Sequence, residues 1–123
     1  MTSPYDSLEP IFHEPKRLAI VSELSGVNNG ITFGELKRLC ELTDGNLSRH
    51  LSALQKEKVV RIEKTFVGVK PQTTVYLTDA GRKKFLQYLS ALENVLKSAA
   101  QRAKAEKENE KPLRGAQAKP SKA

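Results

Sequence analysis

Apolar residues recur along this chain first at helical spacing, then in the alternation of a β-hairpin, and then at helical spacing again. Spacings of three and four residues are typical of an amphipathic helix, whereas alternation of apolar and polar residues is typical of a strand. The pattern predicts, in order, helices over 15–25, 33–40 and 43–58, strands over 59–66 and 73–77, and a last helix over about 79–103.

The ends of these predicted helices carry capping signals. Pro15 suits a first helical position, and Gly26 suits the position just past a helix end. Thr32 and Glu35 have the spacing of a capping box, and Thr43 is placed as the next N-cap. Because only two residues separate the second helix from the third, the pair predicts a helix-turn-helix.

The segment from Thr43 to Lys56 has two unlike faces on a helical wheel. Its leucines share one face, and the opposite face is small, polar and basic. An α-helix fits the major groove of DNA, where the guanidinium of Arg49 can donate two hydrogen bonds to guanine. This segment therefore predicts a DNA recognition helix, with a solvated surface helix as the alternative. The candidate base-contacting residues are Asn46, Ser48, Arg49 and Ser52.

The hairpin that follows, residues 61–77, predicts a basic wing. Its tip is expected to carry Lys70 and Gln72 and to be stiffened by Pro71. Its cations suit phosphate contacts, and backbone N–H groups at the start of the preceding helix suit an anion. The candidate backbone and wing contacts are Thr43, Gly45, Lys56, Arg61, Lys64, Lys70, Gln72 and Thr73.

Other side chains are expected to serve the fold. On the second helix the inner face comprises Phe33, Leu36, Leu39 and Cys40. His50 lies beside the leucine stripe and suits a structural imidazole, Asp44 suits the helix dipole, and Arg82 is expected to contribute to the electrostatic field. Ile31 and Thr32 predict a brief strand, and the apolar residues near Phe12 predict a short helical turn against the body.

Charge is concentrated where the recognition helix and wing are predicted. The chain of 123 residues carries a net charge of +7, and residues 43–84 hold 9 basic against 4 acidic residues, a net of +5. This localisation fits a polyanionic partner. A single cysteine excludes an intrachain disulfide or a cysteine-based metal site. Without an apolar run of about 20 residues or a signal peptide, a cytoplasmic protein with no membrane contact is expected.

The last predicted helix carries an apolar stripe longer than the small body that it leaves. Burial against a second copy would cover the stripe, so the sequence predicts a homodimer. The alternative is packing on the chain's own N-terminal turn and first helix. The predicted interface comprises Phe85, Tyr88, Leu89, Leu92, Val95, Leu96 and Ala99. Residues 1–103 are thus expected to form one domain, and residues 104–123 a disordered basic tail.

Specific runs of sequence carry a family resemblance. TDGNLSRHLSALQKEKVVRIEK and YLTDAGRKKF resemble the small winged-helix transcriptional regulators related to the MarR and ArsR groups, over about residues 8–92. The resemblance implies an α+β winged helix-turn-helix with a long C-terminal dimerisation helix, in a dimeric prokaryotic protein that binds duplex DNA. It implies that residues 43–58 enter the major groove and that residues 61–77 contact adjacent backbone or minor groove. Metal ligands of ArsR relatives have no counterpart at Cys40, His13 or His50.

The leading hypothesis is therefore a homodimeric, sequence-specific transcriptional regulator of double-stranded DNA. A winged-helix module that binds a protein partner, and a non-specific architectural DNA-binding protein, remain alternatives. An enzyme is not expected, because the chain has no phosphate-binding glycine loop and no catalytic constellation. No cofactor or metal is predicted, and no residue set indicates a small-molecule effector.

Overall fold

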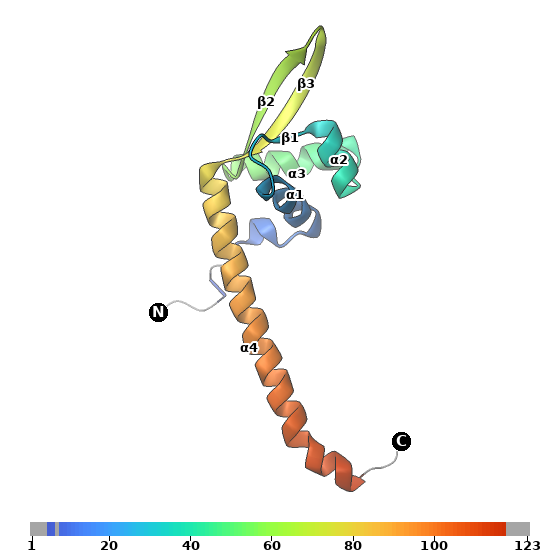
Figure 1. The fold of residues 1–123 in the computed structure, drawn as a ribbon, viewed down its shortest axis with the longest axis vertical. Helices are drawn as coiled ribbons and strands as arrows, with labels where there is room; N and C mark the ends of the chain where they lie inside the picture. The colour runs from blue at the N-terminus through green and yellow to red at the C-terminus, as the bar shows by residue number, and fades with distance from the viewer. Residues whose placement is uncertain (1–4, 7, 118–123) are drawn as a thin grey trace.

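The computed structural model describes residues 5–6 and 8–117, with side chains up to residue 108. Figure 1 shows a small helical body from which a β-hairpin and a long helix project in opposite directions. The elements are η1 (Pro10–Phe12), α1 (Pro15–Ser25), β1 (Ile31–Thr32), α2 (Phe33–Cys40), α3 (Asp44–Lys56), β2 (Val60–Val67), β3 (Lys70–Leu77) and α4 (Asp79–Gln117).

The helix-turn-helix of α2 and α3 forms as its capping residues predict. The Thr32 hydroxyl accepts a hydrogen bond from the Glu35 amide at 3.2 Å, which confirms the N-cap of α2. At the other end Glu41 adopts a left-handed conformation with φ of 54°. This residue reverses the chain within one turn, as left-handed C-terminal residues commonly do. The two helices are consequently joined by Glu41, Leu42 and Thr43 alone.

The sheet has three antiparallel strands in the order β1-β3-β2. The predicted brief strand is confirmed as β1, which pairs Ile31 with Val75 of β3. On its other side β3 pairs with β2 along the whole hairpin, from Val60 opposite Leu77 to Val67 opposite Lys70. We call this β2–β3 hairpin the wing.

The prediction of which residues form the tip of the wing is wrong. The strands are joined by a two-residue loop, Gly68 and Val69, and Gly68 has a φ of 66°. A glycine at positive φ in the first position of such a loop is the arrangement of a type II′ turn. Pro71 and Gln72 lie within β3 instead, opposite Phe66 and Thr65. The sequence pattern predicts a longer loop because proline lacks the N–H group that a paired strand residue donates.

One apolar core joins the helices to the base of the wing. Phe12 of η1 is fully buried and packs against Phe85 and Tyr88 of α4, with ring centroids 5.4 and 5.2 Å away. The predicted inner face of α2 is wrong for Leu39, which is 40% exposed at the edge of the helix. The remaining fully buried large side chains are Ile20, Leu24, Leu36, Leu47, Leu54, Val21, Val59 and Val75.

The start of α4 is hydrogen-bonded to the residues just before β2. The Thr78 hydroxyl donates to the carbonyl of Lys58 at 2.8 Å and accepts from the Gly81 amide at 2.8 Å, so Thr78 is the N-cap of α4. A Cβ atom on Gly81 would lie 2.2 Å from the Val59 carbonyl oxygen. Only glycine allows this close approach of helix and strand.

The long helix extends past the boundary that the sequence predicted. It spans 39 residues, or about 58 Å at 1.5 Å per residue, and ends at Gln117 rather than near residue 103. Alanine, lysine, glutamate and arginine fill most of residues 100–111, and these are strong helix formers. The structure describes residues 104–117 as helix where the sequence predicted a disordered tail, and residues 118–123 lie outside the described part of the chain.

Candidate nucleic-acid interface

Helix α3 turns its apolar side into the core and leaves its polar side uncovered. The Thr43 hydroxyl accepts a hydrogen bond from the Asn46 amide at 3.2 Å and starts the helix as predicted. Its buried residues are Leu47, His50, Leu51 and Leu54. All four candidate base-contacting residues, Asn46, Ser48, Arg49 and Ser52, are exposed. Because none of them supports the core, this face is free to contact a ligand.

Arg49 is oriented by a neighbour on the same face. Its Nη2 atom donates a hydrogen bond to the Asn46 side-chain oxygen at 3.0 Å, one helical turn away. An arginine that is held in place loses less conformational freedom when it binds. The pair therefore presents the guanidinium in a defined direction, with the remaining N–H groups available.

The N-terminus of α3 is open and its acidic residue is compensated. Asp44 forms an ion pair with Lys37 of α2, with Nζ 2.9 Å from Oδ1. This partner, which the sequence interpretation did not identify, offsets the negative charge that would oppose an anion at the helix start. A Cβ atom on Gly45 would meet nothing within 4 Å. The fold itself therefore does not require glycine at this position.

A groove connects α3 to the wing. Its volume is about 330 Å³, and it brings residues from α2, α3, β2 and β3 together. Two serine hydroxyls of the recognition face, those of Ser48 and Ser52, line it beside Lys64 and Thr73 of the wing. The apolar floor comprises Phe33, Leu51 and Ile62. One cation and three hydroxyl groups in a groove make a suitable cradle for a phosphate.

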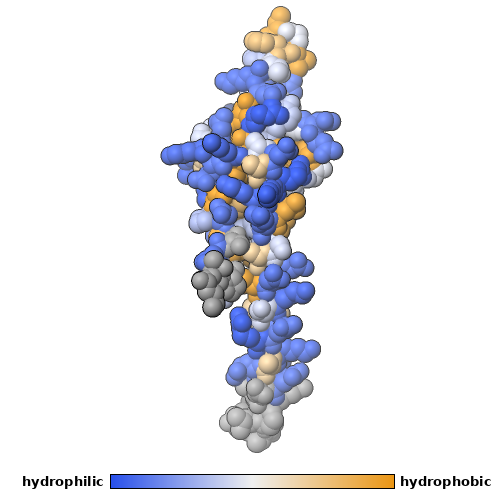
Figure 2. Space-filling view, turned by 90° about the vertical axis from the view of Figure 1, so that its left-hand side faces the viewer, coloured by the Kyte–Doolittle hydropathy of each residue, from blue (hydrophilic) through white to orange (hydrophobic). Residues whose placement is uncertain are grey.

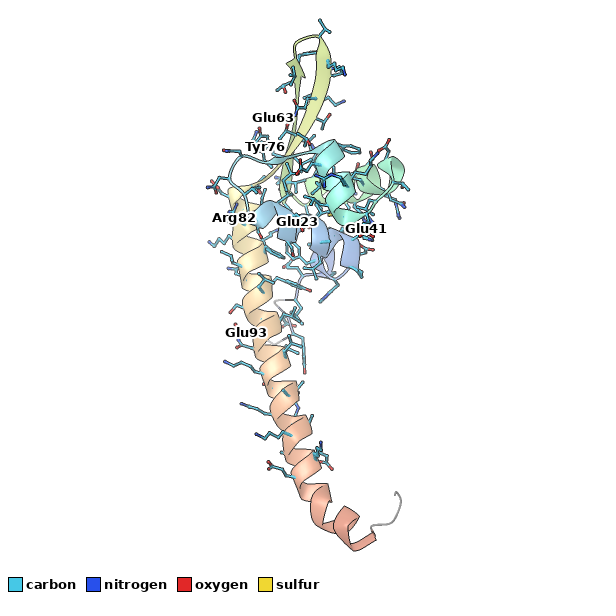
Figure 3. The ribbon with its side chains drawn as sticks, turned by 45° about the vertical axis from the view of Figure 1, so that its right-hand side comes forward. Glu23, Glu41, Glu63, Tyr76, Arg82 and Glu93 are labelled. Atoms are coloured by element: carbon cyan, nitrogen blue, oxygen red, sulfur yellow. The ribbon has the colours of Figure 1, made fainter. Side chains whose placement is uncertain are left out.

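The predicted wing contacts are divided between two faces of the hairpin. Lys64 and its cross-strand partner Thr73 lie on the face toward α3, together with Ile62. Arg61 belongs to the opposite face, where it forms an ion pair with Glu63 and lies 4.3 Å from the ring centre of Tyr76. Figure 3 shows Glu63 and Tyr76 near the base of the wing. A guanidinium with two partners of its own is a weaker candidate for a phosphate contact.

His50 is confirmed as a buried imidazole. It is 6% exposed, and its Nε2 atom lies 3.8 Å from a carboxylate oxygen of Glu14. Burial lowers the pKa of His50 below its ordinary value of 6.5, since a charged imidazole loses hydration there. The Glu14 carboxylate opposes this shift, and the charges of Arg49 and Arg17 add to it. Cys40 is likewise buried, and burial raises the pKa of its thiol.

The predicted dimer stripe is only partly available on α4. Phe85 and Tyr88 are each 2% exposed because they pack on Phe12. Their assignment to a dimer interface is therefore wrong, since both belong to the chain's own core. This packing is the alternative that the sequence left open. Leu92 also contacts the core. On the same stripe Leu89 is 40% exposed, and farther along the helix Leu96 is 60% exposed. Val95 is half-buried and Ala99 is exposed.

Arg82 has a structural partner that sequence reasoning missed. Its guanidinium donates hydrogen bonds to the carbonyls of Ser25 at 3.0 Å and Val27 at 3.4 Å. These acceptors lie at the end of α1, whose last carbonyls have no partner within the helix. Figure 3 shows Arg82 at the start of α4, beside the body. No local signal could have identified this contact, because the partners are 55 and 57 residues apart.

The described part of the chain offers neither a membrane span nor a metal site. None of the helices there combines the length and apolar character needed to cross a membrane. Within residues 5–6 and 8–117, no three His, Cys, Asp or Glu side chains gather in a way that could hold a metal ion.

Comparison with known proteins identifies the same arrangement elsewhere. The family described as Winged helix DNA-binding domain matches residues 16–96. An uncharacterized protein of Methanocaldococcus jannaschii is 33% identical over 79 residues, which cover 64% of this chain and 85% of that protein. The match to the family, over residues 16–96, spans the helix-turn-helix, the wing and the first part of α4.

Solved structures show the same fold. A transcriptional regulator homologue from Pyrococcus horikoshii OT3 has a TM-score of 0.68 and 29% identity, over 72% of this chain and 87% of that chain. MepR of S. aureus, solved in complex with DNA, has a TM-score of 0.63 and 16% identity, over 85% of each chain. A MarR-family transcriptional regulator from Silicibacter pomeroyi has a TM-score of 0.52 and 20% identity, over 94% of this chain and 81% of that chain.

Proposed function

The chain belongs to the family of winged helix DNA-binding domains, and on that premise we propose that it is a homodimeric, sequence-specific transcriptional regulator. In this proposal α3 enters the major groove of double-stranded DNA, and the wing contacts the adjacent backbone or minor groove. The relative from P. horikoshii is itself described as a transcriptional regulator homologue, which supports the assignment.

The observation that carries the proposal is the uncovered polar face of α3 and its continuity with the wing. Asn46 and Arg49 are exposed and joined to each other, and the groove beside them unites the serines of α3 with Lys64. A surface helix that is merely solvated does not require an N-terminal acidic residue neutralised by an ion pair, an arginine oriented by a hydrogen bond, and an adjoining groove that carries a lysine. A duplex would engage all three at once.

Each part of this surface has a distinct role in the proposal. Arg49 contacts a guanine through two hydrogen bonds, and the short serines allow α3 to approach the base edges closely. Lys56, Lys64 and Lys70 contact phosphates, which fix the position of the protein without specifying sequence. The backbone amides at the start of α3, near Gly45, donate hydrogen bonds to a further phosphate.

The dimer in this proposal forms through α4. Helical spacing places Leu96 and Ala99 on the stripe that begins with Phe85 and Tyr88, but the body no longer covers the stripe at that level. A second copy of α4 would bury these side chains. Two recognition helices related by a twofold axis would then contact half-sites about one helical turn apart.

Selection of bound sequences from a random duplex pool, together with the mass of the protein in solution, tests the proposal. We expect a palindromic consensus and a mass twice that of one chain. No measurable duplex binding even at low salt would contradict the proposal and favour a protein-interaction module. Equal affinity for selected and random duplexes at matched salt would instead indicate an architectural DNA-binding protein.

A substitution in Arg49 tests the assignment of α3 to the major groove. Arg49→Ala should weaken binding of the selected duplex by about 1–3 kcal/mol and relax the preference at one base pair. Arg102→Ala provides a control, because Arg102 is an exposed arginine on α4, outside the proposed interface. If both variants bind with wild-type affinity and base preference, α3 does not contact bases through Arg49.

A further inference from the structure

The tip of the wing is apolar and uncovered. Val69 is 93% exposed, and its neighbours Phe66 and Val67 are 71% and 63% exposed. Among the large hydrophobic side chains of the described residues, these three are the most exposed. Figure 2 shows hydrophobic atoms gathered at the upper end of the molecule, which is the wing tip in Figure 1. We call these three residues the apolar tip.

The fold does not explain the apolar tip. The loop of Gly68 and Val69 imposes no need for a large apolar side chain, since the glycine alone supplies the positive φ. No element of the body reaches this end of the hairpin (Figure 1). Large apolar side chains that cluster in solvent commonly mark an interaction site.

Charge around the apolar tip favours one kind of occupant. Lys70 pairs with Val67 directly across the hairpin, and Lys64 lies two positions before Phe66 on β2. Residues 64–73 contain no acidic residue. An apolar tip on a cationic stem is complementary to a polyanion whose interior is apolar, as a DNA duplex is.

The apolar tip is also continuous with the proposed DNA surface. Lys64 and Thr73 line the groove beside Ser48 and Ser52 of α3, and the two strands run from this groove to the loop. From the groove to the loop the strands continue for about three residues, or roughly 10 Å at 3.3 Å per residue. A duplex seated on α3 would therefore extend along the wing toward its tip.

We propose that the apolar tip inserts into the minor groove as a wedge and bends the duplex. This inference rests on the proposed function and adds a specific contact to it. Apolar side chains that enter the minor groove partly unstack a base step and kink the duplex toward the major groove. Flexible pyrimidine–purine steps deform most easily, so the operator should carry such a step beneath each wing.

The experiment measures bending and affinity on the selected duplex, using the full chain. The duplex carries a fluorescent donor at one end and an acceptor at the other, so that bending raises the transfer efficiency. Val69→Thr and the double variant Phe66→Thr/Val69→Thr remove apolar character but keep strand-forming side chains. Val27→Thr is the matched control, since Val27 is a 39% exposed valine in the loop between α1 and β1.

We expect the wild type to bend the duplex and the double variant to bend it much less and bind about tenfold more weakly. The dependence of affinity on salt should stay unchanged, because no phosphate contact is removed. Val27→Thr should behave as the wild type. Thermal melting of each variant should match the wild type, since the substituted side chains are exposed.

Four outcomes would overturn the inference. If the wild type leaves the duplex straight, or the double variant bends and binds it equally well, the apolar tip is no wedge, although the proposed function stands. If the double variant instead lowers the mass of the protein in solution, the tip is a contact between copies. If the wild type binds no duplex at low salt, the proposed function and this inference fall together.

Discussion

Gly34 and Gly45 occupy the same position in two successive helices. Each is the second residue after its N-cap threonine, and a Cβ atom at either would meet nothing within 4 Å. Alanine should therefore fit both sites and stabilise the fold slightly, since glycine costs conformational entropy in a helix. The two glycines differ only in what faces them, because Gly45 lies on the proposed DNA surface.

Gly45→Ala and Gly34→Ala form a matched pair of variants. Both should raise the free energy of unfolding by about 0.5 kcal/mol in urea titrations. Only Gly45→Ala should weaken binding of the selected duplex, by about tenfold, because its methyl group would occupy the space where the backbone of α3 approaches the DNA. Equal affinities of the two variants would show that close approach at Gly45 plays no part.

His50 should make the stability of the domain depend on pH. Since burial lowers its pKa in the folded state, the unfolded chain binds the proton more readily. Stability should therefore be complete above the ordinary pKa of 6.5 and should fall as the pH drops from there toward the lowered value.

Urea titrations between pH 7.5 and 5.5 measure this effect. In His50→Leu, which continues the leucine stripe of α3, the decline in unfolding free energy below pH 6.5 should be smaller than in the wild type. The comparison uses the slope against pH, so a constant change in stability caused by the substitution does not affect it. Identical slopes in the two proteins would exclude His50 as the group that titrates.

At the scale of elements, the two faces of the wing should contribute differently to DNA binding. Lys64 faces the groove beside α3, whereas Arg61 is engaged by Glu63 and Tyr76 on the other face. A phosphate contact contributes about one unit to the slope of log K against log salt. The salt dependence of each alanine variant therefore identifies the face toward the DNA.

Lys64→Ala should weaken binding to all duplexes alike and reduce the salt slope by about one unit. Arg61→Ala should leave that slope unchanged. Both quantities come from affinities measured across a series of salt concentrations with selected and random duplexes. If Arg61→Ala reduced the salt slope and Lys64→Ala left it unchanged, the face of the wing that carries Arg61 would be the one toward the DNA.

At the scale of the whole molecule, α4 leaves the body while its apolar stripe continues. Glu93 lies on α4 where the helix has passed the body in Figure 3, and Leu96 follows it with 60% of its side chain exposed. Leu86 is 58% exposed but lies on a different side of the helix, about 80° from Leu96 at 100° per residue. A comparison of substitutions at the two leucines therefore distinguishes the effect of exposure from the effect of position on the stripe.

Leu96→Lys should dissociate the proposed dimer, because it places a charge in the middle of the apolar contact. Leu86→Lys, with nearly the same exposure, should leave the dimer intact. Sedimentation equilibrium over a range of concentrations gives the mass of each variant. If Leu96→Lys retains the mass of the wild type and Leu86→Lys does not, the contact between copies lies on another side of α4.

Local signals determined the order of elements. The capping threonines, Pro15 and the switch from helical spacing to alternation depend on near neighbours, so a sequence shows them directly. The uncovered face of α3 was predictable for the same reason, since three leucines can bury only one side of a short helix.

Long-range contacts were decided by the tertiary structure. The sequence could not show that Phe12 covers Phe85 and Tyr88, that Arg82 binds the end of α1, or that Arg61 is turned away from α3. These outcomes depend on residues brought together from distant positions. An apolar stripe or a lone cation indicates that a partner is needed, whereas the partner itself is determined only when the chain folds.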